Sequence, residues 1–116
     1  MRRRILIIDD EKLLLAAYRR MLSAHDVVVA VGGREALSLL DTDRAFDLVL
    51  CDLMMPDVDG KQVYEFICSE APELRSRLAF HTGGAASQVL RNFSEWTDIP
   101  ILHKPLLPDA IDRLLE

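Results

Sequence analysis

Five short apolar runs recur along the chain, and each is followed by a segment with helical spacing. The runs cover residues 5–8, 27–31, 48–51, 78–81 and 99–103, and the helical segments cover roughly 11–24, 33–41, 60–70, 86–95 and 107–115. The first and third runs are continuously apolar, which is typical of parallel strands that helices cover on both faces. Strict alternation of strand and helix predicts an α/β fold with an open parallel sheet and helices on both sides.

Polar side chains stand at the carboxyl ends of four of these predicted strands. Asp9 and Asp10 follow the first strand, Asp52 ends the third, Thr82 follows the fourth and Lys104 follows the fifth. An open parallel sheet places its working site outside the carboxyl ends of its strands. We therefore expect these five side chains to converge on one edge of the sheet.

Three carboxylates in one cleft would repel one another unless a cation lies between them. A hard divalent ion with oxygen ligands is the natural partner, and Mg²⁺ commonly takes one or two carboxylates and keeps several waters. Lys104 offers a compact charge that suits a phosphate oxygen. Thr82 offers a hydroxyl, and Gly83 and Gly84 leave room and backbone donors for an incoming group. The combination predicts an aspartyl-phosphate site.

The ordered motifs are more specific than any one residue. The chain carries the acidic pair in ILIIDDE, then Asp52 in LCDLMMPDVDG, Thr82 in HTGG, and Lys104-Pro105 in HKPL. Over essentially its whole length it resembles the receiver domain of two-component response regulators. The resemblance implies one domain over residues 1–116, a flavodoxin-like doubly wound (βα)5 fold with strand order 2-1-3-4-5, and a cis peptide bond before Pro105.

The resemblance also implies a metal site. Asp10 would ligate Mg²⁺ (or Mn²⁺) directly, together with Asp52 and the backbone carbonyl of Met54. Asp9 would act mainly through water. Gly60 is expected to allow the turn into the third helix.

By the same resemblance, Asp52 accepts a phosphoryl group from a phosphohistidine of a histidine kinase or histidine phosphotransfer protein. Lys104 would pair with the phosphoryl group, and Thr82 would bond to it and switch the conformation. Such a domain catalyses its own phosphorylation and dephosphorylation and is not a turnover enzyme. Ile101 stands where many receivers have an aromatic switch residue, and the TGG segment and the ending around Lys104 resemble receivers of hybrid histidine kinases.

Three other functions are weighed against this one. A phosphohydrolase similar to haloacid dehalogenases would need a second aspartate where the chain has Met54. A flavodoxin-like FMN binder would need a polar phosphate loop after the first strand, and Asp9 and Asp10 would repel that phosphate. A degenerate receiver that serves only as a binding module is disfavoured by the complete acidic set, although Ile101 keeps this alternative open.

The first helix carries more leucine than its buried face requires. Leu13, Leu14 and Leu15 are consecutive, and consecutive helical residues lie ~100° apart, so at least one must be exposed. Our hypothesis is a docking surface for a helical, histidine-bearing partner, with Tyr18 as a neighbour. A slightly over-apolar helix is the alternative.

Cys51, His81 and His103 each lie one residue before a candidate site residue. Because side chains alternate along a strand, we expect the three to point away from the acidic cleft. We favour the interpretation that these three polar side chains are simply buried in the core over the alternative that they bind zinc.

Composition limits the kinds of partner and the cellular location that the sequence predicts. The 116 residues include 14 basic and 19 acidic side chains, and the net charge of -5 argues against non-specific nucleic-acid binding. No apolar run approaches the ~20 residues of a membrane span, and no secretory signal is present. The two cysteines fit no disulfide or metal spacing. These features predict a cytoplasmic domain.

Overall fold

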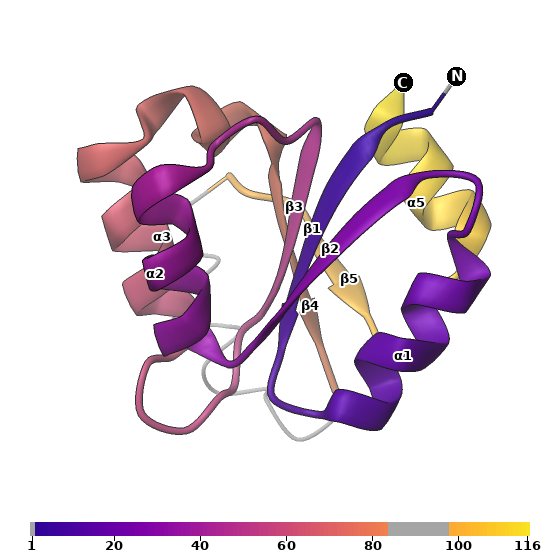
Figure 1. The fold of residues 1–116 in the computed structure, drawn as a ribbon, viewed down its shortest axis with the longest axis horizontal. Coiled ribbons are helices and arrows are strands. Elements are labelled where there is room, and N and C mark those ends of the chain that lie inside the picture. The colour runs from indigo at the N-terminus through magenta and orange to yellow at the C-terminus, as the bar shows by residue number, and fades with distance from the viewer. Residues whose placement is uncertain (1, 84–97) are drawn as a thin grey trace.

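Five parallel strands form one sheet at the centre of the computed structural model, which describes residues 2–83 and 98–116 (Figure 1). The strands follow the order β2-β1-β3-β4-β5, and the predicted order is therefore confirmed. Their bounds are Arg4–Asp9 for β1, Asp26–Val31 for β2, Leu48–Asp52 for β3, Leu78–Thr82 for β4 and Ile101–His103 for β5.

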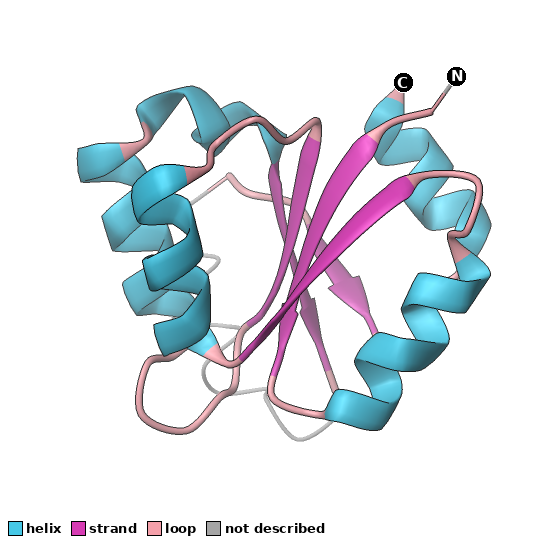
Figure 2. Ribbon diagram, viewed as in Figure 1, coloured by secondary structure: helices cyan, strands magenta, loops and turns pink. Residues whose placement is uncertain are grey.

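Helices cover both faces of the sheet. On one side lie α2 and α3, and on the other lie α1 and α5 (Figure 2). Their bounds are Lys12–Met21 for α1, Gly33–Thr42 for α2, Gly60–Glu70 for α3 and Pro108–Leu115 for α5, with a 3-10 helix at Pro72–Arg77. The helix predicted for residues 86–95 lies outside the described residues. None of the described helices is long and apolar enough to cross a membrane.

The two faces of the sheet account for the continuously apolar strands. In β1, Leu6 and Ile8 pack into the core beneath α2 and α3, whereas Ile5 and Ile7 pack into the core beneath α1 and α5. All four side chains are fully buried. A strand between two helical layers has no solvent face and therefore no polar alternation.

The strand register corrects one prediction from the sequence. Cys51 pairs with Phe80, and it is Asp52 that pairs with His81. Cys51 therefore belongs to the core under α2 and α3, while His81 lies level with the acidic cleft and His103 is exposed. The prediction that the three point away from the cleft together was wrong, because β4 is offset from β3 by one residue and a one-residue offset reverses the face.

Helix α1 exposes one leucine, as expected. Leu13 is 88 % exposed, Leu14 is half-buried and Leu15 is buried. Tyr18, however, is only 3 % exposed, and its hydroxyl accepts a hydrogen bond from the Leu106 N–H at 3.2 Å. The expectation that Tyr18 lies on a docking surface was wrong, because its helical position faces the sheet.

Gly60 begins α3 at a point of close approach to β3. The preceding Asp59 caps the helix in a reciprocal pair with Gln62. A Cβ on Gly60 would lie 2.6 Å from the Asp52 carbonyl oxygen and 2.8 Å from the Leu53 Cα. Glycine is required here by the backbone that it touches, and the contact ties α3 to the residue that ends β3.

Substitution of Gly60 by alanine should destabilise the fold. The new methyl group would overlap rigid backbone, so we expect the free energy of unfolding to fall by about 1–3 kcal/mol. Urea unfolding followed by circular dichroism measures this change. Gly83→Ala is the matched control, because a Cβ there meets none of the described residues within 4 Å; equal losses for the two variants would contradict the explanation.

Candidate functional site

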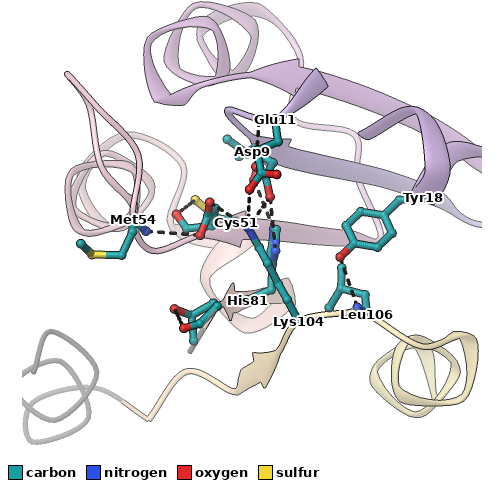
Figure 3. A network of polar contacts seen from close by, with 12 residues as sticks. Asp9, Glu11, Tyr18, Cys51, Met54, His81, Lys104 and Leu106 are labelled. Carbon is teal, nitrogen blue, oxygen red and sulfur yellow. Dashed lines mark hydrogen bonds and ion pairs between the residues drawn. The ribbon is translucent and has the colours of Figure 1, made fainter. Parts of the chain in front are cut away.

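Two buried carboxylates and one ammonium meet at the carboxyl edge of the sheet. Asp9 ends β1, Asp52 ends β3 and Lys104 follows β5. Lys104 Nζ lies 2.8 Å from Asp9 Oδ2 and 3.1 Å from Asp52 Oδ2, and its side chain points towards Asp9 in Figure 3. Asp9 is 0 % exposed and Asp52 is 3 % exposed. Because solvent barely reaches the carboxylates, their charges act on one another and on Lys104 with little screening.

The backbone fixes one oxygen of each carboxylate. Asp9 Oδ1 accepts the Glu11 N–H at 3.0 Å, and Asp52 Oδ1 accepts the Met54 N–H at 3.3 Å. Both bonds join a side chain to the amide two residues later, the local turn that aspartate commonly forms. In each case the second oxygen, Oδ2, is left facing Lys104. The two acids are therefore oriented by their own chain before any ligand arrives.

Lys104 is held from two sides. Its N–H donates to the Thr82 carbonyl oxygen at 2.8 Å, which continues the pairing of β4 with β5. The bond between Lys104 and Pro105 is cis, as expected, and the next residue, Leu106, donates its N–H to the Tyr18 hydroxyl. Helix α1 thus fixes the segment that carries the ammonium.

Asp10 and Met54 lie at the rim of the cluster. Asp10 is exposed, and its carboxylate comes within 4.8 Å of those of Asp9 and Glu11. Met54 is 50 % exposed and lies two residues after Asp52, in the loop that follows β3. The sequence therefore placed both residues at the right edge, and the Asp10 ligand role and the Met54 carbonyl role stay predictions.

Thr82 is buried at the end of β4. Its hydroxyl donates to the carbonyl oxygen of the adjacent Gly83 at 3.2 Å. Gly83 is exposed, and Gly84 lies outside the described residues. The hydroxyl would have to leave its local partner to reach a group attached at Asp52.

His81 is the residue that sequence reasoning missed. Its ring is fully buried, with Nε2 3.2 Å from the Ile8 carbonyl oxygen and Nδ1 3.7 Å from Asp9 Oδ2. The edge of the ring meets Tyr18 in a T-shaped contact with centroids 6.3 Å apart. The available signal was an ionisable side chain in an otherwise apolar strand, but the face it occupies depends on the register.

Burial dominates the acid-base properties of the cluster. It raises the pKa of Asp52 to about 6, with a further increase from the Asp9 charge and an opposing decrease from Lys104. Burial likewise lowers the pKa of His81 to about 4, although the Asp9 charge acts in the other direction. Burial alone would lower the pKa of Lys104, but its close ion pair with Asp9 and its hydrogen bond and ion pair with Asp52 leave that pKa raised.

The cluster fits a divalent cation. Asp9 Oδ2 is paired with the Lys104 ammonium at 2.8 Å, whereas His81 Nδ1 has no hydrogen-bond partner among the described residues. A buried polar atom without a partner costs about 1–3 kcal/mol. Carboxylate oxygens in this arrangement are the ligands that Mg²⁺ and similar ions take. The donor atoms of Asp9, Asp52 and His81 lie within 4.8 Å of one another.

Removing the Asp52 charge should stabilise the metal-free protein. Folding raises this pKa from 3.8 to about 6, so the ionised side chain opposes folding above about pH 6 and has no such effect below about pH 4. We expect Asp52→Asn to have a free energy of unfolding about 1–3 kcal/mol above that of the unsubstituted protein at neutral pH, with the difference vanishing towards pH 4.

Urea unfolding in chelator at several pH values measures this difference. Comparing the two proteins at each pH cancels the titration of acids that both retain. A variant that is less stable at neutral pH, or a difference that does not change with pH, would contradict the assigned burial cost.

Comparison with known proteins identifies the family of the chain. The family model described as the response regulator receiver domain matches residues 5–116. The response regulator MprA of Mycolicibacterium vanbaalenii is 41% identical over 73 residues, which cover 61% of this chain and 31% of MprA. Histidine kinase 2 of Arabidopsis thaliana is 26% identical over 102 residues, which cover 86% of this chain and 8% of that protein. The chain therefore spans less than a third of the length of these relatives.

Solved structures share the fold. The bacteriophytochrome response regulator AtBRR superposes with a TM-score of 0.79 at 26% identity, covering 99% of this chain and 91% of AtBRR. A response regulator receiver domain protein from Clostridium thermocellum gives a TM-score of 0.82 at 21% identity, covering 97% and 90% of the two chains. With the match to the family model over nearly its whole length, the chain belongs to the response regulator receiver domain family.

Proposed function

We propose that this receiver domain takes a phosphoryl group onto Asp52 from a phosphohistidine, with the help of a divalent cation. The observation that carries the proposal is the position of Asp52. Asp52 ends a buried strand. Its Oδ2 lies 3.1 Å from the Lys104 ammonium, and its Oδ1 accepts a hydrogen bond from the Met54 N–H. A nucleophilic carboxylate needs this combination of rigid support and a nearby positive charge.

The transfer requires an ionised Asp52. A carboxylate oxygen forms a bond to phosphorus, the bond from phosphorus to the donor imidazole nitrogen breaks, and its electron pair stays on the imidazole. Lys104 then holds an oxygen of the transferred group, since it is already within reach of Asp52. Its ammonium also favours the ionised form of Asp52 against the burial that raises the pKa.

Asp9, Asp10, Asp52 and the Met54 carbonyl are the groups that would hold Mg²⁺ or Mn²⁺. A bound ion would neutralise the charge of the carboxylates and of the phosphoryl oxygens. Asp9 and Asp52 are oriented for this by their bonds to backbone amides, and Asp10 can approach from the exposed rim.

Phosphorylation would act as a switch through Thr82. The added group brings roughly -1.5 to -2 charges and strong acceptor oxygens. Such an acceptor would draw the Thr82 hydroxyl away from the Gly83 carbonyl oxygen and change the segment that follows β4. Ile101 occupies the expected aromatic position and packs at the edge of the core under α2 and α3, so the aromatic part of the switch is absent.

The partner in this proposal is a histidine kinase or histidine phosphotransfer protein, and the setting is the cytoplasm. The similarity to a plant histidine kinase over 86% of this chain supports a hybrid-kinase type of receiver. Phosphorylation-independent binding is the alternative, and the intact cluster of Asp9, Asp52 and Lys104 argues against it. Helix α1 offers the exposed Leu13 as a contact for a helical partner.

The phosphorylation test uses acetyl phosphate and Mg²⁺. The protein should gain one phosphoryl group that is stable in acid and labile in base, as an acyl phosphate is. Mass spectrometry of the intact protein detects it. Asp52→Asn should show no adduct, whereas Asp57→Asn, an exposed aspartate of the same loop, should be phosphorylated normally. An adduct that persists in Asp52→Asn would overturn the assignment.

A second test addresses docking. Leu13→Glu should slow transfer from a phosphorylated histidine phosphotransfer protein by about tenfold, because it places a charge in an apolar contact. The rate with acetyl phosphate should not change. Leu107→Glu is the matched control, since Leu107 is 60 % exposed but lies at the start of α5. Equal slowing with both phosphate sources would rule out a docking role for Leu13.

A further inference from the structure

The acidic cleft contains a buried nitrogen that the proposed phosphorylation does not use. His81 is fully buried, and its Nδ1 has no hydrogen-bond partner among the described residues. This atom is 3.7 Å from Asp9 Oδ2, which also lacks a well-directed hydrogen bond. Two buried polar atoms therefore lie 3.7 Å apart with no hydrogen bond between them.

The other ring nitrogen decides which atom carries the proton. His81 Nε2 lies 3.2 Å from the Ile8 carbonyl oxygen, and a carbonyl oxygen only accepts. In the neutral ring the proton is therefore on Nε2, and Nδ1 presents its lone pair to the Asp9 carboxylate. Two electron-rich atoms aimed at each other call for a cation between them.

We propose that His81 Nδ1 is a metal ligand, and that it combines with Asp9 and Asp52 to make a mixed nitrogen and oxygen site for a divalent transition ion. The inference deepens the proposed function, because it concerns the same cleft and changes which ion the cleft prefers. Mg²⁺ favours oxygen donors, whereas imidazole suits ions such as Co²⁺ and Zn²⁺. A receiver with an imidazole at this position should therefore bind such ions more tightly than Mg²⁺.

The spacing of His81 and Asp9 is compatible with a shared ion, and Asp52 belongs to the same close group. The carboxylate oxygens of Asp9 and Asp52 and a ring nitrogen of His81 all lie within 4.8 Å of one another. Two ligands that each bind an ion at about 2.0–2.2 Å can be up to about 4.4 Å apart. The separation of 3.7 Å between His81 Nδ1 and Asp9 Oδ2 falls within this limit.

The surroundings of His81 resemble those of an established imidazole ligand. Metal-binding histidines usually donate their second N–H to a carbonyl or carboxylate, which fixes the ring and its tautomer. Here the Ile8 carbonyl oxygen has that position, and Tyr18 packs against the ring at a near right angle. The hydroxyl of Tyr18 is itself bound to the Leu106 N–H, so the ring is held on rigid elements.

Lys104 occupies part of the space beside the two acids. Its ammonium lies 2.8 Å from Asp9 Oδ2 without a well-directed hydrogen bond to that atom, but donates to Asp52 Oδ2 at 3.1 Å. The side chain is 16% exposed, and its ammonium also lies 3.8 Å from the exposed carboxylate of Glu11, which offers it a position nearer the surface. Metal entry would displace it from Asp9 and leave it beside Asp52.

Metal titration tests the preference. Co²⁺ is added to the tag-free protein while its visible absorption is followed, and Mg²⁺ is then used as a competitor. We expect Co²⁺ to bind at least about tenfold more tightly than Mg²⁺, and His81→Leu to lose about tenfold in Co²⁺ affinity with little change for Mg²⁺. His103→Leu, which removes the exposed histidine of β5, should behave as the unsubstituted protein does.

A spectroscopic measurement does not depend on the folding of His81→Leu. In the double variant His25→Gln/His103→Gln, His81 is the one remaining histidine of the sequence. Pulsed electron paramagnetic resonance of Mn²⁺ bound to this variant should show coupling to an imidazole ¹⁴N nucleus. Absence of that coupling, or equal affinity for Co²⁺ and Mg²⁺, would overturn the proposal and leave a buried water or an Asp9–His81 ion pair as the explanation of this arrangement.

The test of the His81 ligand and the test of Asp52 phosphorylation can fail independently of each other. Nitrogen coupling is measured without any phosphate donor, and phosphorylation of Asp52 is measured with Mg²⁺ alone. Phosphorylation without nitrogen coupling would reject only the His81 ligand. Nitrogen coupling without phosphorylation would reject only the phosphoryl transfer.

Discussion

The burial of two carboxylates beside a single ammonium is the constraint on which this site depends. Asp9 and Asp52 are nearly inaccessible, and Lys104 faces an oxygen of each. Burial and mutual repulsion both disfavour the charged acids, which is why the pKa of Asp52 is raised to about 6. A divalent cation between the carboxylates would relieve both effects at once, and carboxylate oxygens suit such an ion.

The scaffold keeps this unfavourable arrangement in place. Strands β1 and β3 bring the acids to one edge, and backbone amides two residues later fix an oxygen of each. Gly60 packs closely against the Asp52 carbonyl and donates its N–H to the Leu53 carbonyl oxygen at 3.1 Å, which joins the start of α3 to the end of β3. Apolar rows beneath the site supply the stability that the charged cluster does not, since the side chains of β1 are buried on both faces.

The proposed switch would have to operate without an aromatic side chain at position 101. The chain has Ile101 at the position where many receivers carry an aromatic residue. An aromatic side chain does contact the site from the other face, where Tyr18 touches His81 and binds the Leu106 N–H beyond the cis bond. Helix α1 therefore touches both the acid cluster, through His81, and the segment that holds Lys104. Changes in the cleft have a direct structural route to a helix that also exposes Leu13.

The sequence by itself determined the alternation of strands and helices, the sheet edge that carries the chemistry, and the meeting of Asp9, Asp52 and Lys104, because periodicity and the carboxyl-end rule depend only on local pattern. The strand order followed from the family resemblance. The sequence also required an exposed leucine in α1, from helix geometry alone. Only the tertiary structure decided the place of His81, since the face of a strand residue follows from the register, and a one-residue offset between β3 and β4 separates it from Cys51. Likewise, only packing could show that Tyr18 is buried and that Gly60 is required by close backbone contact, because both depend on which segments approach from elsewhere in the chain.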